Sequence, residues 1–239
     1  MTNISGAVVL VTGANGGLGV EFVAQALERG ATKVYAAART PRGWDDERIV
    51  PLRLDVTDAA SVAEAAKHAG DTTVVINNAG VGGAEPISSA EFDDIRSVME
   101  TNFFGALAVA RDFAPVLASN GGGALVNVLS VSSWIAGAGA YSASKAALWS
   151  ATNSLRLELT PQKTQVVGLR LGYADTPMTA DLTVPKADPA EIVRNAYEGI
   201  EAGQLEILAD GPSQQVKARL SASVETNYPQ LGNPLNDLQ

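Results

Sequence analysis

The alternation of short apolar runs with longer amphipathic segments constrains the fold of this chain more than any other feature. Apolar residues in the longer segments recur at a spacing of about 3.6, which predicts helices. Strands that are apolar at nearly every position are buried on both faces, as parallel strands covered by helices are. The pattern therefore predicts a doubly wound α/β fold of three layers with a parallel sheet in the middle. Seven runs predict its strands: residues 7–11, 33–37, 49–53, 73–76, 124–129, 165–171 and 205–208.

The chain has 239 residues, which suits one α/β domain spanning residues 1–239. The connection over residues 39–48 contains Pro41 and Gly43 and is too short for a crossover helix, so we expect a loop there. Near the end the apolar periodicity is lost and Pro229 and Pro234 appear. Residues 226–239 are therefore predicted to form an irregular C-terminal tail over the surface.

Composition excludes several classes of function. Lys and Arg number 17 against 26 Asp and Glu, a net charge of −9, so no general basic field attracts nucleic acid or an anionic membrane. With no cysteine and only one histidine, His68, the chain has no Cys/His zinc site, disulfide or thiolate nucleophile, and we expect no metal. No apolar run approaches the length of about 18 residues that a membrane span needs, and no secretory leader is visible, so a cytoplasmic location is expected.

A glycine-rich turn follows the first predicted strand directly and leads into a helical segment. It reads Thr12-Gly-Ala-Asn-Gly-Gly-Leu-Gly19. Glycine permits positive φ and lets the backbone approach a ligand, while a helix N-terminus offers free N–H groups and the positive end of its dipole. The sequence therefore predicts a phosphate-binding turn at this end of the sheet.

Three further motifs follow in order: Asn77-Asn-Ala-Gly80 after the fourth strand, Asn102 in the next helix, and Tyr141-Ser-Ala-Ser-Lys145. With the glycine turn they resemble the short-chain dehydrogenase/reductase family in its compact subtype, over residues 8–178. The resemblance implies a Rossmann-like, seven-stranded parallel sheet that binds NAD or NADP, with Ala174 and Thr176 near the nicotinamide carboxamide. The residues it implies around the dinucleotide are Gly13, Asn15, Gly17, Leu18, Gly19, Asp55, Val56, Asn78, Ala79, Gly80, Tyr141 and Lys145.

The end of the second strand decides between the two cofactors. A carboxylate there would bind the ribose hydroxyls of NAD and repel a 2′-phosphate, but this chain reads Ala36-Ala-Ala-Arg39. A charge-assisted bond from Arg39 to phosphate is worth roughly 1.5 to 3 kcal/mol, or about ten- to hundredfold in affinity. We therefore expect NADP, with NADPH preferred over NADH; the alternative is that Arg39 is a solvated surface cation.

Tyr141 and Lys145 are four residues apart, which places them on one face of a helix. Reduction of a ketone needs a proton donor, and an ordinary phenol has a pKa of about 10. A Lys ammonium about 4 Å away can lower that pKa by roughly two to three units. The pair is thus predicted to be the acid/base unit, with the lysine also holding the ribose as the resemblance implies.

A stretch of serines ends the fifth strand, where α/β active sites open. Alignment with the family places the catalytic serine at Ser130, whose hydroxyl would stabilise charge on the substrate oxygen. Its interval of 11 residues to Tyr141 is shorter than usual in the family, which leaves Ser132 as the alternative and as a candidate substrate contact. Asn102 matches the asparagine that holds a water in a proton relay through Lys145.

Four larger side chains near the predicted site could line an apolar substrate cleft, although each could equally anchor the core or a loop. They are Trp134, Ile135, Tyr173 and Met178. Leu171 stands where the family has proline before a glycine, which makes this turn less rigid.

Together these residues predict an NADP(H)-dependent oxidoreductase that interconverts a carbonyl and a secondary alcohol without metal, acting on a hydrophobic ketone or alcohol. A protein that binds NAD(P) as a sensor or scaffold without turnover is the alternative. The family's usual arrangement implies a homodimer through the two long helices over residues 95–118 and 141–159, with a homotetramer as the alternative.

Overall fold

The computed structural model describes residues 2–83 and 85–231. One parallel sheet of seven strands runs through it in the order β3-β2-β1-β4-β5-β6-β7. The sheet confirms the predicted fold class, and no strand bound differs from the predicted one by more than one residue. The strands are β1 (Val8–Thr12), β2 (Lys33–Ala38), β3 (Ile49–Arg53), β4 (Val74–Asn77), β5 (Gly123–Val128), β6 (Thr164–Arg170) and β7 (Glu206–Leu208).

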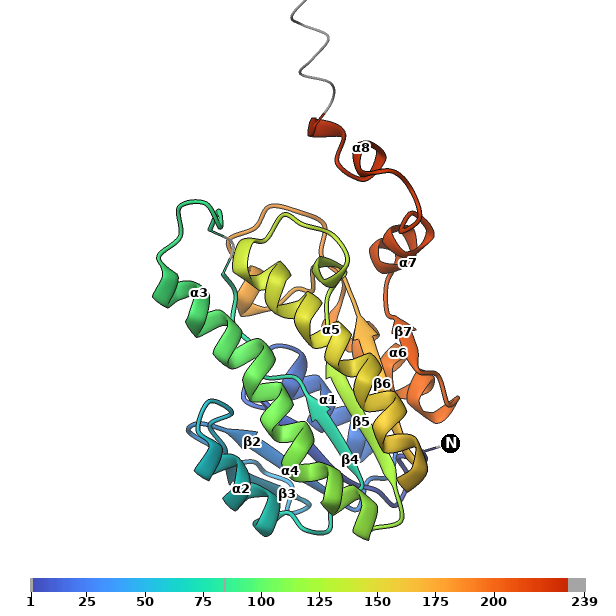
Figure 1. Ribbon diagram of the computed structural model, residues 1–239. Coiled ribbons are helices and arrows are strands. Elements are labelled where there is room, and N and C mark those ends of the chain that lie inside the picture. Colours follow the sequence, from blue (N-terminus) through green and yellow to red (C-terminus); the bar gives the residue numbers. More distant parts are fainter. Residues whose placement is uncertain (1, 84, 232–239) are drawn as a thin grey trace, which may run out of the picture.

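Helices cover both faces of the sheet (Figure 1). On one face α1 (Leu18–Glu28) packs with α6 (Pro189–Glu201), and on the other lie α2 (Ala59–His68), α4 (Ala106–Ser119) and α5 (Gly139–Leu159). A hydrophobic core lies on each face of the sheet, and alternate residues of β1 pack into each of them. Val9 and Val11 pack on the side of α1 and α6, and Leu10 packs on the side of α2, α4 and α5. This arrangement is the physical reason for the continuous apolar runs in the sequence.

The strand order reverses between β1 and β4, because the chain leaves β1 for β2 and β3 and then returns to the other side of β1. A crevice opens at such a switch point beyond the carboxyl ends of the strands. The glycine turn after β1 and the Asn77–Gly80 segment after β4 both lie there.

The first of the two predicted long helices is one helical run with a change of pitch. It begins as α3 (Phe92–Met99), continues as a π-helical turn, η1 (Glu100–Gly105), and ends as α4. A π-turn widens the helix and shifts the direction of the side chains that follow, and such turns are frequent at functional sites. The turn contains Asn102.

The connection over residues 39–48 is a loop, as predicted. The C-terminal region is more helical than predicted, because after β7 it forms α7 (Gly211–Ala218), α8 (Val224–Asn227) and a 3₁₀ turn at Pro229–Leu231. The expectation of an irregular tail is thus wrong for residues 226–231, and residues 232–239 lie outside the described part of the chain. The Tyr228 hydroxyl there accepts a hydrogen bond from the Ala136 amide at 3.0 Å. In the described residues, no helix has the length and apolar character needed to cross a bilayer.

Candidate active site

The glycine turn between β1 and α1 is shaped so that only glycine fits at its key positions. Gly13 has φ +67°, and a Cβ on it would lie 3.0 Å from the Ala79 Cα atom. A Cβ on Gly19 would collide with the carbonyl oxygen of Gly13. Gly17, with φ +53°, caps α1 without a side-chain hydrogen bond. The turn therefore brings bare backbone and the positive end of a helix dipole to the crevice.

Thr12 and Asn78 tie this turn to the neighbouring strand. The Thr12 hydroxyl accepts hydrogen bonds from the amides of Asn78 and Ala79, both at 3.0 Å. In return, the Asn78 side-chain amide donates to the carbonyl oxygens of Thr12 at 2.9 Å and Gly13 at 3.3 Å. These bonds brace the sheet at the switch point, as the family resemblance implies for Asn78 and its neighbours.

A groove of about 340 Å³ opens beside the turn. Seven of the predicted cofactor residues line it: Gly13, Asn15, Arg39, Asp55, Val56, Ala79 and Gly80. Gly17 lies at one end of the turn, where a Cβ would meet the Thr176 side chain at 3.5 Å. The groove, the glycine cradle and the start of α1 fit an elongated, phosphate-bearing dinucleotide.

The end of the groove beside β2 and β3 has a cation and a carboxylate that follow different strands. Arg39 follows β2 and is exposed, while Asp55 follows β3 and accepts hydrogen bonds from the amide and hydroxyl of Thr57 at 3.0 and 2.7 Å. Those bonds, helped by the positive charges of Arg39 and Arg53, lower the pKa of Asp55. The Asp55 carboxylate thus bonds to Thr57 in its own loop, and the exposed Arg39 side chain lines the groove.

Tyr141 and Lys145 lie one turn apart near the start of α5, with the Lys145 Nζ atom 5.6 Å from the centre of the Tyr141 ring. Lys145 is 4% exposed and donates a hydrogen bond to the carbonyl oxygen of Val128 at 2.7 Å. Burial lowers the pKa of Lys145 to about 8.

The pKa of Tyr141 is raised, because burial outweighs the opposing hydrogen bond with the Ser130 side chain. Our expectation that the lysine lowers this pKa is therefore wrong for the structure as it stands. The reason is physical: the phenol loses its solvation, and the ammonium is directed at a backbone carbonyl.

Ser130 lies at the end of β5 and caps the 3₁₀ turn η2 (Val131–Ser133). Its Oγ atom accepts a hydrogen bond from the Ser132 amide at 3.1 Å, so its own proton is free to be donated. It also faces the Tyr141 hydroxyl. Of the two candidate serines, Ser130 is thus the one that the structure brings to the tyrosine.

Asn102 joins the π-turn to the segment after β4. Its Oδ1 atom accepts from the Val81 amide at 2.8 Å, and its Nδ2 atom donates to the Val81 carbonyl at 2.9 Å and to the Ser144 hydroxyl at 3.1 Å. Ser144 in turn donates to the Tyr141 carbonyl at 2.7 Å. A Cβ on Gly80 would lie 3.2 Å from Asn102 Oδ1 and 3.8 Å from Lys145 Nζ, which places these two side chains around the same glycine.

The predicted substrate residues divide into two groups. Tyr173 is 51% exposed and Met178 54% exposed, on the loop after β6, and Ile135 is half-buried. The ring of Trp134 instead stacks on the Arg170 guanidinium, 3.7 Å from the ring centre, and meets the edge of Trp149. Trp134 is therefore packed into the protein, whereas Tyr173 and Met178 are open to a ligand.

Ala174, near the start of the same loop, is buried and forms a bridge with Ala187.

The hydrogen bonds of the polar side chains inside the strands were not predicted from the sequence. Asn77 and Asn127 are opposite each other in the register of β4 and β5 and share a 2.9 Å hydrogen bond, which Asn127 extends to Thr152. Arg170 ends β6 and is fully buried. A polar residue within an otherwise apolar strand could have indicated a buried hydrogen bond, but the sequence does not identify the residue that accepts or donates it.

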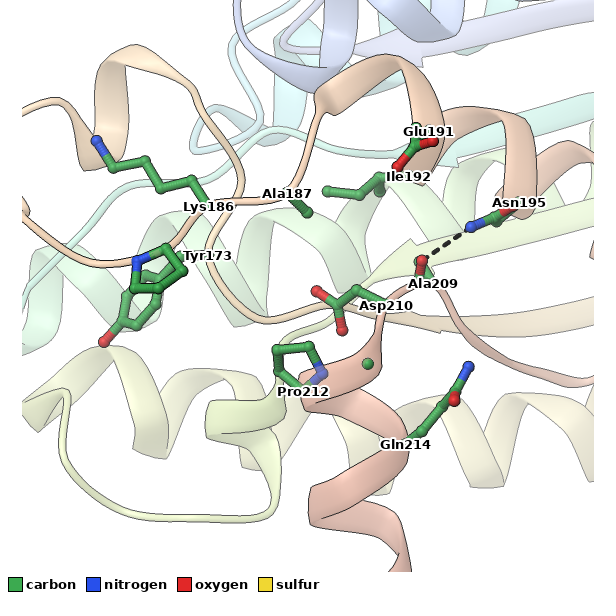
Figure 2. Close-up of a pocket in the computed structure, with 12 residues that line it drawn as sticks. Tyr173, Lys186, Ala187, Glu191, Ile192, Asn195, Ala209, Asp210, Pro212 and Gln214 are labelled. Atoms are coloured by element: carbon green, nitrogen blue, oxygen red, sulfur yellow. Dashed lines mark hydrogen bonds between the residues drawn. The ribbon is translucent and has the colours of Figure 1, made fainter.

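A larger hollow, about 480 Å³, lies outside this cluster between the loop after β6, the start of α6 and the start of α7 (Figure 2). Its polar groups mostly have partners within the protein. The Asp210 carboxylate accepts from the amides of Gly172 at 2.6 Å and Ser213 at 2.8 Å, and Asn195 donates to the Ala209 carbonyl at 2.9 Å. Of the predicted site residues only Tyr173 borders it, so the hollow is not the reactive centre.

Comparisons with known proteins agree with this geometry. Residues 7–187 match the family model described as short chain dehydrogenase. A crystal structure of a short chain dehydrogenase from Burkholderia cenocepacia in complex with NADP superposes with a TM-score of 0.90 and 38% identity, covering 96% of this chain and 99% of that one.

Two curated proteins are similar over much of the chain. The 1-deoxy-11-beta-hydroxypentalenate dehydrogenase of Streptomyces avermitilis is 34% identical over 81% of this chain and 78% of its own length. The NADPH-dependent 1-acyldihydroxyacetone phosphate reductase of Schizosaccharomyces pombe is 35% identical over 70% of this chain and 60% of its own length. The matched family model and these relatives show that the chain is an oxidoreductase that belongs to the short-chain dehydrogenase/reductase family.

Proposed function

We propose that the protein is an NADP(H)-dependent oxidoreductase that interconverts a hydrophobic ketone and its secondary alcohol without metal, with Tyr141 as the general acid and base. The observation that carries the proposal is the convergence of three groups at the end of β5. The Tyr141 phenol faces the Ser130 hydroxyl, and Lys145 lies against the tyrosine ring beside the groove.

The residues that line the groove would hold the cofactor, which would supply a hydride to the carbonyl carbon as NADPH or accept one from the alcohol carbon as NADP⁺. The Tyr141 phenol is protonated at neutral pH and so carries the proton that the oxygen of a ketone being reduced needs, but its raised pKa makes it a weaker acid than an ordinary phenol. The Ser130 hydroxyl, whose oxygen accepts from the Ser132 amide, would donate its proton to the same oxygen in place of its hydrogen bond with Tyr141. Lys145 and Asn102, which surround Gly80, support the exchange of that proton with solvent.

The preference for NADPH over NADH rests on Arg39. The proposal is supported by the NADP complex of the Burkholderia protein and by the NADPH-dependent relative from Schizosaccharomyces pombe. Arg39→Asp should weaken NADPH binding about ten- to hundredfold and change NADH binding much less, because only NADPH offers the 2′-phosphate.

Arg42→Asp is the matched control, since Arg42 is an exposed arginine on the same loop that stacks on Trp44 and does not line the groove. Dissociation constants for both cofactors, measured by fluorescence titration of the three proteins, test the assignment. Equal losses for NADPH and NADH with Arg39→Asp would remove it.

Turnover is tested by NADPH oxidation with a panel of hydrophobic ketones, including steroid, cyclic and aryl ketones, and by NADP reduction with the corresponding alcohols. The exposed Tyr173 and Met178 beside the site favour apolar substrates. Turnover of at least one pair supports the proposal. Tight cofactor binding with no turnover of any substrate favours a sensor or scaffold.

We also propose a cytoplasmic homodimer formed through η1–α4 and α5, with a tetramer as the alternative. Phe104 on η1 is 49% exposed and Leu157 on α5 is 81% exposed, and pairing with a second copy would cover both. Light scattering of the purified protein measures the mass: twice the chain mass supports the dimer, and four times supports the tetramer.

A further inference from the structure

Arg170 is the largest fully buried side chain near the candidate active site, and the reaction proposed above does not use it. It is the last residue of β6, next to β5, and it is 0% exposed. Its Nε atom donates to the Ser133 hydroxyl at 3.2 Å, and its Nη1 atom donates to the Glu206 carboxylate at 2.8 Å. The face of the guanidinium lies 3.7 Å from the ring centre of Trp134.

Stability alone is a poor reason for a charge at this position. Burial lowers the pKa of Arg170 to about 10, and its Nη2 atom has no hydrogen-bond partner in the described part of the chain. Replacing a buried ion pair by apolar residues of similar volume is often neutral or stabilising. The contacts that an apolar side chain could not reproduce are those to Ser133 and Glu206.

Those contacts lead to the candidate catalytic serine. The Ser133 hydroxyl accepts from Arg170 and donates to the Ser130 carbonyl at 2.6 Å. Because the arginine occupies the acceptor side of the Ser133 oxygen, it directs the hydroxyl proton toward that carbonyl. The Ser133 amide donates to the same carbonyl at 3.0 Å, and the Val131 amide donates to the carbonyl oxygen of Leu171 at 2.9 Å. The short turn that carries Ser130 is thus held by Arg170, the last residue of β6, and by Leu171, which follows it.

Glu206 anchors the guanidinium from the other side. One of its carboxylate oxygens accepts from Arg170, and the other pairs with Lys217 of α7 at 2.6 Å. A guanidinium held by a carboxylate and stacked on an indole has little freedom to rotate. It is therefore a rigid support for the hydrogen bond to Ser133.

We propose that Arg170 is a positioning residue, which fixes the Ser130 hydroxyl toward Tyr141 through Ser133. The inference rests on the proposed function, since it assigns Ser130 the role of orienting the substrate oxygen. In the described residues the side chain of Arg170 donates hydrogen bonds to Ser133 and Glu206 and to neither Ser130 nor Tyr141, so it acts through the turn.

The test uses Ser133→Ala, which removes the hydroxyl and leaves the arginine, together with Arg170→Lys and the double variant. Each single change should lower kcat about three- to tenfold, as expected for one lost hydrogen bond, with the KM for NADPH unchanged. The kcat of the double variant should be no lower than that of the less active single variant, because both changes break the same hydrogen bond.

Hydrogen exchange of residues 130–136 supplies a readout that does not need turnover. Exchange there should speed up in Ser133→Ala and Arg170→Lys. Arg156→Lys is the matched control, since that arginine also bonds backbone carbonyls, those of Val166 in β6 and of Leu205 just before β7, but donates no hydrogen bond to the described residues of the turn. It should leave both kcat and exchange in residues 130–136 as in the wild type.

Unchanged kcat in Ser133→Ala, or losses that multiply in the double variant, would overturn the positioning role. A fall in unfolding temperature without a fall in kcat would show that Arg170 only stabilises the fold. Should Arg170→Lys fail to fold, Ser133→Ala decides alone. Should the wild type turn over no ketone or alcohol, the proposed function fails, and faster exchange in Ser133→Ala would still show that the hydroxyl holds the turn.

Discussion

Replacing Lys145 by methionine is expected to stabilise the fold at neutral pH while it removes turnover. The lysine is 4% exposed, and burial lowers its pKa from 10.5 to about 8. At about 1.36 kcal/mol per pKa unit, holding the charge costs the folded state about 3 kcal/mol at pH 7. Methionine fills a similar volume without a charge, but it gives up the 2.7 Å hydrogen bond to Val128, which offsets about 1 to 2 kcal/mol. The net gain is about 1 to 2 kcal/mol, or roughly 2 to 8 °C in unfolding temperature.

The gain depends on pH in a direction that the pKa sets. The unfolded chain keeps this lysine protonated up to about pH 10.5, whereas the folded protein releases the proton near pH 8. Between these values the unfolded state binds more protons, so the wild type becomes more stable as the pH rises. By pH 9.5 it should have recovered about 2 kcal/mol, and the advantage of Lys145→Met should be gone.

Urea unfolding of both proteins at pH 7 and pH 9.5 measures this difference. Lys67→Met is the control, because Lys67 is an exposed lysine of α2 whose ion pair with Glu64 is its only one among residues 2–83 and 85–231, and its replacement should change stability little at either pH. A Lys145→Met protein that is less stable than the wild type at pH 7, or a difference that does not depend on pH, would refute the reasoning that burial of this charge is costly.

Two further substitutions test the site. Ser130→Ala should lower kcat about a hundredfold or more, as the loss of an oxyanion donor does, whereas Ser132→Ala should cost much less; a larger loss with Ser132→Ala reverses the assignment. Gly19→Ala should abolish NADPH binding in a fluorescence titration, because its Cβ collides with the Gly13 carbonyl and the turn must open. Gly16→Ala is its control, since a Cβ there meets nothing within 4 Å, and retained binding in both proteins would contradict the steric argument.

The sheet and the nucleotide end were predictable because local rules set them. Parallel strands covered on both faces must be apolar throughout, and the turn after β1 admits only glycine where the backbone has positive φ or makes close contact, as at Gly13. No strand bound differed from the prediction by more than one residue. The order of the motifs then identified the family.

The parts that the sequence did not predict depend on contacts between distant segments. The direction of the Tyr141 pKa follows from the partial burial of the phenol, which spacing to Lys145 does not reveal. Trp134 was a candidate substrate contact, but its ring stacks on the guanidinium of Arg170, which lies 36 positions further along the chain. The π-turn that holds Asn102 likewise looks like ordinary helix in the sequence.

The most direct test of the proposed chemistry is the rate of hydride transfer by Tyr141→Phe in a single turnover, measured from NADPH absorbance with a ketone that the wild type reduces. The change removes one hydroxyl, and the dissociation constant of NADPH, measured on the same protein, shows whether the groove is intact. General acid catalysis by this phenol predicts a rate about 10² to 10⁴ times slower with cofactor affinity unchanged. A rate equal to that of the wild type would contradict the assignment of Tyr141 as the proton donor.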